Sequence, residues 1–538
     1  MKKKLWLLTI LLTLVSCDET ASINDSSNTS NDSSNLTSFV NKDDIFDKEA
    51  RLNDFTLKDL DRAYNRHRPI ESIGEPQVLV LPVLFKDSKM SEDEQKKVKE
   101  DLNKAFFGKS EDTGWESVSS FYQKSSYNRL NIKGEVAPFV TLDKTLSEVV
   151  NLTQQTNPYK YTTNNNAYYY DTSYYPLKKG LEILKKEHNY DYTKFDANRD
   201  GSIDAVWVIY GEKEYSSYLS ENKITAYDPN YQKISSFLWA YTYWYIGRGN
   251  LYNPNPRTYA FASYNFMYTK GFDKVDAHTY IHETGHMLGL DDYYNYDYGN
   301  SLSRIKKDYS SPTGALDMMD NNIGDHNAFS KYLLKWVDPK IVNKEGTYTL
   351  SSFQNGGECL IIPSSTWNGS PYQEYLIIEY YTKDGLNLLD ATSQYAGVYP
   401  ILFQENGFKI YHVDARVGGI INNEASYLDN PLDYKETYKN GHFLGLINSN
   451  TPSLNKFYNS NNSSNSTYNS RLITLLSATG TNNYFSGSRG GRNANDKDLF
   501  KNGSSLNSYT FHNGNNLEFQ ISIGECNDKE GIITFKRG

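Results

Sequence analysis

Two histidines four residues apart, with a glutamate beside the first, stand out in the segment HETGHMLGLDDYY, which covers residues 282–294. Residues four apart lie on one face of an α-helix, so His282 and His286 can direct their imidazoles at one point, as a tetrahedral zinc site requires. Glu283 lies one residue round the helix, where its carboxylate can reach a water on the metal but is badly placed as a ligand. The spacing therefore predicts a zinc site with Glu283 as its catalytic base.

A third metal ligand is expected just after this helix. Gly289 comes three residues after His286, where a glycine can adopt the left-handed conformation that ends a helix and reverses the chain. The reversal would bring Asp292 back toward the metal, although the adjacent Asp291 could be the ligand instead. His278, one turn earlier on the helix, lies too far away to complete a tetrahedron, so we expect it to pack or to support a ligand.

The helix that carries the motif and the elements around it indicate an α+β fold. The residues just before the motif contain no glycine or proline, so a helix is expected over about 274–288. Strands are expected near Val78 and Val206, with a charged helix over 91–106 between them. Further along, short alternating segments separated by Gly and Asn turns indicate a β-rich, sandwich-like region. The predicted division is a catalytic domain over residues 75–339 and a β-rich C-terminal region over residues 340–538.

The motif and its flanks resemble the signature His-Glu-x-Gly-His-x-Leu-Gly-Leu-x-Asp-x-Tyr of the immune inhibitor A-like family of secreted bacterial metallopeptidases. The family's usual proline before the aspartate is Asp291 here, which leaves the ligands intact and adds a nearby negative charge. Downstream, the segment 317–319 (DMM) resembles the family's Asp-x-Met, so Met319 is the better candidate for the methionine that supports the zinc site. The matching positions of the signature are His282, Glu283, Gly285, His286, Leu288, Gly289, Leu290, Asp292 and Tyr294.

Other segments agree with the family in their order along the chain, namely 78–87, 117–136, 328–339, 375–384 and 407–414. The resemblance implies a zincin or metzincin-like catalytic domain that hydrolyses peptide bonds of extracellular proteins. Zinc would be bound by two histidines and an aspartate and would activate a water, with Glu283 as general base and acid. The alternative is a non-catalytic surface adhesion or scaffold lipoprotein that retains the metallopeptidase fold, and the intact Glu283 argues against it.

Three further polar residues are expected to have structural rather than catalytic roles. His326 is a weak candidate for an additional donor to the reacting oxygen, and a structural role is favoured for it. His412 and Asp414 alternate with apolar residues in a strand pattern, so cross-strand packing is the expected role for both.

A second cation site is suggested by residues 196–204, with the sequence DANRDGSID. Oxygen side chains occupy alternate positions there and a glycine stands sixth, as in loops that wrap calcium. The twelfth position, where a complete EF-hand has a bidentate glutamate, is Trp207, and an Asp/Asn/Gly turn without an ion is the alternative. The expected calcium ligands are Asp196, Asn198, Asp200, Ser202 and Asp204.

The N-terminus has the features of an exported lipoprotein. Residues 1–16 contain three lysines followed by an apolar run too short to span a bilayer, which is typical of a signal peptide. The sequence LVSC at 14–17 resembles a lipoprotein box, so cleavage before Cys17 would leave a lipid-anchored cysteine, although an ordinary signal peptide with an incidental cysteine is the alternative. The protein is therefore expected outside the cytoplasm, anchored to the membrane or cell surface.

Composition and charge indicate the character of the N-terminal segments and limit the classes of binding partner. Residues 17–45 are expected to contain the lipidated cysteine and a Ser/Asn-rich flexible tether, and residues 46–74 are expected to form an N-terminal arm or short pro-segment. The net charge is -9, and loss of the three leader lysines makes it -12, which argues against nucleic acid as a partner. The family resemblance implies protein or peptide substrates. The sequence leaves open whether Cys359 and Cys526 form a disulfide.

Overall fold

The fold is described from a computed structural model of the 538-residue chain. The structure describes residues 69–162, 168–169, 171–245, 247, 249–269, 271–295, 311–321, 323–365, 367, 369–397, 399, 401–421, 424–427, 443–450, 471–480, 484 and 493–538. The predicted signal peptide, Cys17, the tether and most of the predicted N-terminal arm lie outside the described residues. The described residues all belong to one compact unit. Within these residues, no helix combines the length and apolar character needed to cross a membrane.

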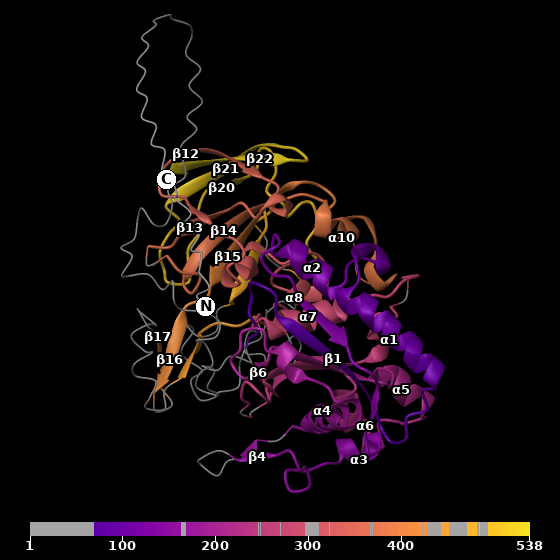
Figure 1. Ribbon diagram of the computed structural model, residues 1–538. Coiled ribbons are helices and arrows are strands. Elements are labelled where there is room, and N and C mark those ends of the chain that lie inside the picture. The colour runs from indigo at the N-terminus through magenta and orange to yellow at the C-terminus, as the bar shows by residue number, and fades with distance from the viewer. Residues whose placement is uncertain are drawn as a thin grey trace, which may run out of the picture. The chain divides into compact units, whose positions relative to one another are not determined.

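A six-stranded sheet forms the centre of the N-terminal half (Figure 1). Its strands are β1 (Gln77–Leu84), β2 (Lys133–Val136), β3 (Val140–Thr141), β7 (Ala205–Tyr210), β8 (Tyr241–Trp244) and β10 (Thr258–Ser263). The strand order is β2-β1-β7-β10-β8, with β3 also paired to β1, and only the edge strand β8 is antiparallel to its neighbour. Strands β1 and β7 are nearly continuous apolar runs because both faces of this sheet are covered.

Helices cover the two faces of this sheet (Figure 1). On one face, α1 (Glu92–Phe107), α2 (Val118–Ser125) and α7 (His278–Met287) share an apolar core with Val80 and Trp207. On the other face, Leu81 and Val208 pack with a second set of helices. This set consists of α3 (Leu146–Val150), α4 (Tyr174–His188), α5 (Tyr215–Glu221) and α6 (Tyr231–Phe237).

Local sequence signals fix where two of these helices begin. Ser91 and Glu94 form a capping box at the start of α1, so this helix lies where it was predicted. Helix α7 begins at His278, four residues later than predicted. The reason is that the Asp276 carboxylate accepts the His278 amide at 3.0 Å and Ala277 has the non-helical angles φ -109° and ψ 5°.

Two further sheets in the C-terminal half pack against each other. One contains β11 (Lys340–Ile341), β13 (Cys359–Pro363), β14 (Glu374–Tyr381), β15 (Gly407–Asp414) and β19 (Ile473–Leu476), and the other contains β12 (Gly346–Ser351), β20 (Ser505–Leu506), β21 (Phe519–Cys526) and β22 (Glu530–Arg537). Apolar residues such as Ile378 and Phe408 of the first sheet and Ile533 of the second share one core. Cys359 and Cys526 are both free thiols, so they do not form the disulfide that the sequence left open.

The opposite face of the five-stranded sheet helps to build the core behind α7. Tyr375 and Ile377 of β14 and Tyr411 of β15 belong to the same apolar cluster as Tyr280 and Ile281 of α7. The predicted division after residue 339 therefore runs through a shared core. The mixture of helices and strands confirms the predicted α+β class.

Shorter elements complete the described part of the chain. The helices are α8 (Met318–Asn321), α9 (Ala328–Leu333) and α10 (Leu388–Thr392). The strands are β4 (Tyr161–Thr162), β5 (Tyr168–Tyr169), β6 (Ser202–Ile203), β9 (Asn255–Pro256), β16 (Val417–Ile421), β17 (Glu424–Tyr427) and β18 (Phe443–Leu446).

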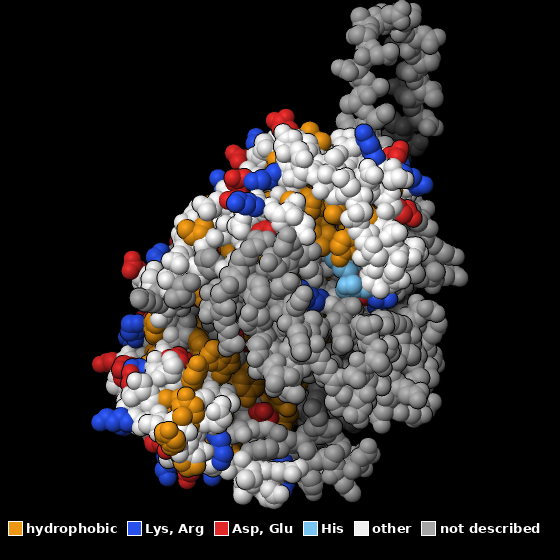
Figure 2. Space-filling model, turned by 180° about the vertical axis from the view of Figure 1, so that it is seen from behind, with side chains coloured by type: hydrophobic (Ala, Val, Ile, Leu, Met, Phe, Trp, Pro, Cys, Tyr) orange, Lys and Arg blue, Asp and Glu red, His pale blue; other side chains and the backbone are white. Residues whose placement is uncertain are grey.

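Figure 2 shows one face of the molecule, on which charged side chains of both signs are scattered and hydrophobic side chains gather in a hollow.

Candidate metal centre

Helix α7 and the turn after it bring three potential ligands together. His282 and His286 lie on one face of the helix, and their ring centroids are 4.9 Å apart. Gly289 has a φ of 100°, in the left-handed region that favours glycine, and the chain reverses there. As a result, Oδ1 of Asp292 lies 3.1 Å from Nε2 of His282 and 3.2 Å from Nε2 of His286.

Backbone carbonyls orient both imidazoles. Nδ1 of His282 is 2.7 Å from the Met318 carbonyl oxygen, and Nδ1 of His286 is 2.7 Å from that of Leu290. A carbonyl can only accept, so Nδ1 carries a proton in each ring, and Nε2, which lies nearer to Asp292, is the nitrogen that a metal could use. The three ligand atoms lie within 4.8 Å of one another. Two imidazole nitrogens and a carboxylate oxygen at this spacing fit a tetrahedral zinc ion.

The three side chains are largely buried and together favour positive charge. The exposed fraction is 6% for His282, 19% for His286 and 7% for Asp292. Burial disfavours the charged imidazolium, but the Asp292 carboxylate outweighs it and raises the pKa of His286 to about 10. Burial also opposes ionisation of Asp292, yet the neighbouring His286 and His282 hold its pKa well below its usual range. A divalent cation would supply the positive charge that this arrangement favours.

The geometry distinguishes between the two adjacent aspartates. Among the described residues, the group of converging ligand atoms contains Asp292 and does not contain Asp291. The amide of the next residue, Tyr293, donates to the Met319 carbonyl at 2.8 Å, which fixes the turn. The arrangement therefore favours Asp292 as the third ligand.

Glu283 lies beside these ligands and is contacted by Thr242 from the edge strand β8 of the sheet. Its exposed fraction is 6%, and burial raises the pKa of its carboxyl group, against the opposing effect of His286 and His282. The Thr242 hydroxyl on β8 donates to the Glu283 carbonyl oxygen at 2.9 Å and lies 3.2 Å from Oε2 of the carboxylate. Sequence reasoning missed Thr242, because nothing local connects this short strand to a motif 41 positions later.

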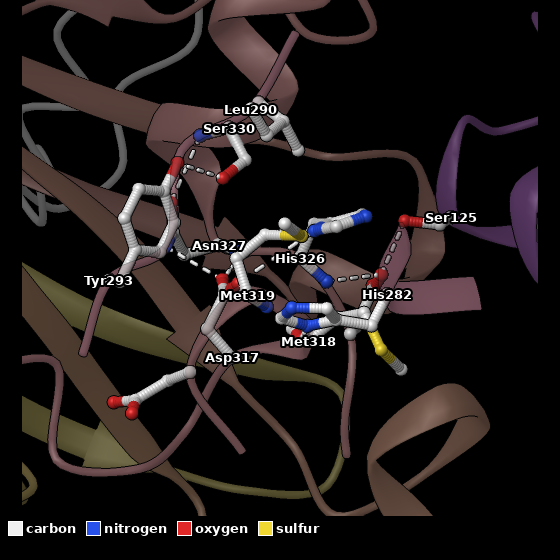
Figure 3. Close-up of polar contacts among 12 residues, drawn as sticks. Ser125, His282, Leu290, Tyr293, Asp317, Met318, Met319, His326, Asn327 and Ser330 are labelled. Atoms are coloured by element: carbon white, nitrogen blue, oxygen red, sulfur yellow. Dashed lines mark hydrogen bonds and ion pairs between the residues drawn. The ribbon is translucent and has the colours of Figure 1, made fainter. Parts of the chain in front are cut away.

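Met319 packs against helix α7 at Gly285. A β-carbon on Gly285 would lie only 2.4 Å from the Met319 sulfur, so the thioether packs directly against the glycine of the motif. The Asp317 carboxylate accepts the amides of Met319 and Asn327, both at 2.7 Å, and thereby shapes the turn. Figure 3 shows His282 beside Met318 and Met319, with Asp317 in the same cluster of side chains.

The two other histidines near the centre pack against aromatic rings. His278 hydrogen-bonds to Asp276 through Nδ1, and its ring stacks on Trp115 with centroids 4.6 Å apart. His326, labelled in Figure 3, is buried between Tyr122 and Trp336, with centroid distances of 5.9 Å and 6.0 Å. These surroundings favour a structural role for both residues.

Residues 196–204 form a turn before β7 whose carboxylates bind backbone amides. The Asp196 carboxylate accepts two amides of the loop at 2.9 Å each, and Asp200 lies 3.4 Å from Arg257. Asp204 accepts the Gln77 amide at 2.8 Å, and burial raises its pKa to about 6. Among the described residues, the acidic side chains of this loop do not form a group of three converging ligands, and calcium stays a prediction. A cavity of about 120 Å³ is lined by Asn198, Asp200, Ser202 and Asp204, with Glu71 and Arg257 among its other residues.

His412 and Asp414 lie on β15 and meet the paired strand β14 as expected, and they also belong to a polar cluster. Nε2 of His412 is 2.9 Å from Oε1 of Glu374 on β14. Nδ1 of His512, from the segment between β20 and β21, is 2.9 Å from Oδ2 of Asp414. Sequence reasoning missed Glu374 and His512, because their proximity depends on strand pairing and on a segment far along the chain.

The protein is thus a mixed α+β chain with a candidate metal centre built from one helix and the turn that follows it. Comparison of the sequence with models of known protein families gave no match, and a search among curated proteins found no similar sequence. The function of the centre is therefore inferred from its geometry and from the motif that forms it.

Proposed function

We propose that the chain is a zinc-dependent endopeptidase of the zincin class, similar to the immune inhibitor A-like metallopeptidases. The observation that carries the proposal is the position of Glu283, a buried carboxylate on the same helix as two of three converging ligands. His282, His286 and Asp292 would hold the metal. A zinc ion bound there would supply Lewis acidity, which lowers the pKa of water and polarises a peptide carbonyl.

In this proposal Glu283 moves the protons. Its carboxylate takes a proton from the attacking water and later delivers it to the amine that leaves. Burial raises the pKa of Glu283 above its usual value, which is the direction that makes its carboxylate a better proton acceptor. The Thr242 hydroxyl, 3.2 Å from Oε2, would hold the carboxylate in position between these two steps.

The proposed setting is the outside of the cell. The lipid-anchored Cys17 predicted from the sequence would attach the enzyme to the membrane, and the substrates would be extracellular proteins or peptides. A calcium ion in the loop over 196–204 is proposed as a stabilising second metal, since the sequence of this loop places oxygen side chains at alternate positions with a glycine at the sixth.

Cleavage of an unbiased peptide library tests the activity. The purified protein is incubated with the library and the products are sequenced by mass spectrometry. We expect cuts at internal peptide bonds, loss of cleavage when a chelator removes the metal, and recovery when zinc is added back. A library that stays intact with zinc present would overturn the proposal and favour the scaffold alternative.

A further inference from the structure

A second cluster of potential ligands lies in the C-terminal half, beside the core between the two packed sheets. We call it the sandwich cluster, and it consists of Glu374 on β14, His412 on β15 and His512 in the segment between β20 and β21. One ligand atom from each residue lies within 4.8 Å of the other two. The centroids of the two imidazole rings are 4.4 Å apart. The donors are therefore close enough to share one ion.

The strand register explains why these side chains meet. Glu374 pairs with Asp414 on the neighbouring strand, and His412 pairs with Leu376. Because alternate residues of a strand share a face, all four point toward the core between the sheets. The segment that carries His512 covers this end of the sheet, and the amides of His512 and Asn513 both donate to the Glu374 carboxylate.

Among the described residues, the ion pairs of this region include one group of fixed positive charge, the Arg416 guanidinium. The side chains of Glu374 and Asp414 have an exposed fraction of 0%. Arg416 contacts both, at 2.7 Å from Asp414 and 3.7 Å from Glu374. Within the part of the chain that the structure describes, two buried carboxylates that face one guanidinium leave one negative charge unbalanced, and burying an uncompensated charge is costly. A cation among these side chains would remove the deficit.

We propose that Glu374, His412 and His512 bind a divalent transition-metal ion of the zinc class, in a site separate from the one on α7. Two imidazoles and one carboxylate are a donor set that such ions prefer. The amides that donate to Glu374, and Asp414 at 2.9 Å from Nδ1 of His512, are the outer contacts that orient ligands in metal sites. His512, with an exposed fraction of 30%, provides access from solvent.

The role of this metal would be structural. It would fasten the segment between β20 and β21 to β14 and β15, and so tie the two packed sheets together at one end. The site does not depend on the catalytic proposal, since it shares no residue with the centre on α7.

Zinc content of the full-length protein tests the proposal. Wild type, His286→Ala, His512→Ala and the double variant are loaded with zinc, desalted and measured by plasma mass spectrometry. We expect two equivalents in the wild type, one in each single variant and none in the double variant. His188→Ala is the matched control, because this exposed histidine at the end of α4 belongs to neither group of ligands, and it should retain two equivalents.

A second variant guards against a folding defect. Glu374→Gln keeps the shape of the side chain and removes its charge, so it should also lose one equivalent while its circular dichroism spectrum matches that of the wild type. Wild-type zinc content in both His512→Ala and Glu374→Gln would overturn the proposal and leave a proton on a histidine as the balancing charge. Failure of the α7 site would appear separately, as an unchanged zinc content in His286→Ala.

Discussion

Replacing Thr242 with valine tests whether the edge strand β8 positions the proposed catalytic base. The valine keeps the shape of the side chain and removes the hydroxyl that lies 2.9 Å from the Glu283 carbonyl oxygen and 3.2 Å from its Oε2. A hydrogen bond to a charged group contributes about 1.5–3 kcal/mol. Thr242 has a single hydrogen to share between two acceptors, so we expect a contribution at or just below the lower end of this range. A loss of about 1–1.5 kcal/mol in the transition state corresponds to a decrease of roughly 5- to 13-fold in kcat/KM.

The assay is hydrolysis of a fluorogenic peptide chosen from the library products, with zinc content measured on the same samples. Thr242→Ser retains the hydroxyl and is the control, so its kcat/KM should stay near that of the wild type. Zinc content should be equal in all three proteins, because Thr242 contacts the base and none of the three ligands is among its acceptors. Wild-type kcat/KM in Thr242→Val would refute the positioning role, and loss of zinc from that variant would assign Thr242 to the integrity of the metal site instead.

Three further predictions concern stability. Gly285→Ala places a β-carbon 2.4 Å from the Met319 sulfur and should lower the free energy of unfolding by about 1–3 kcal/mol, as measured in urea titrations. The double variant with Met319→Ala should lose less free energy of unfolding than the sum of the losses in the two single variants. Burial raises the pKa of Asp390 from 3.8 to about 7, so the stability linked to this carboxyl group is present below pH 4 and is lost as the pH rises to 7. The free energy of unfolding of Asp390→Asn should therefore rise relative to that of the wild type by about 1.4 kcal/mol per pH unit between pH 4 and pH 7, and the difference should be constant above pH 7. Unfolding titrations at several pH values measure this difference. A difference that does not change with pH would contradict the assignment. Calcium should raise the melting temperature of the zinc-free protein if it binds the loop over 196–204, and Asp200→Ala should abolish that rise in calorimetry.

Local patterns in the sequence were sufficient to predict several helices and strands of the fold. The capping box at Ser91 placed α1, and the alternation of apolar residues placed β15 at Gly407–Asp414. The glycine after the second histidine has the positive φ that its position in the motif predicts. These features depend on residues within a few positions of one another, which a single sequence records directly.

Contacts between distant segments could not be predicted in the same way. Thr242 meets Glu283 only because β8 pairs with β10 at the sheet edge nearest to α7, and no local pattern specifies that pairing. The amide of His512 reaches Glu374 across 138 positions of sequence. Similarly, two adjacent aspartates look equivalent in sequence, and the choice of Asp292 depends on the backbone path through the turn.

Zinc content and peptide cleavage measured on one preparation of Glu283→Ala test the central claim most directly. The carboxylate is proposed to move protons and not to bind the metal, so we predict wild-type zinc content together with a decrease in kcat of at least about 100-fold. Wild-type cleavage by this variant would contradict the role of Glu283, and loss of zinc along with cleavage would show that the residue holds the metal rather than acting as the base.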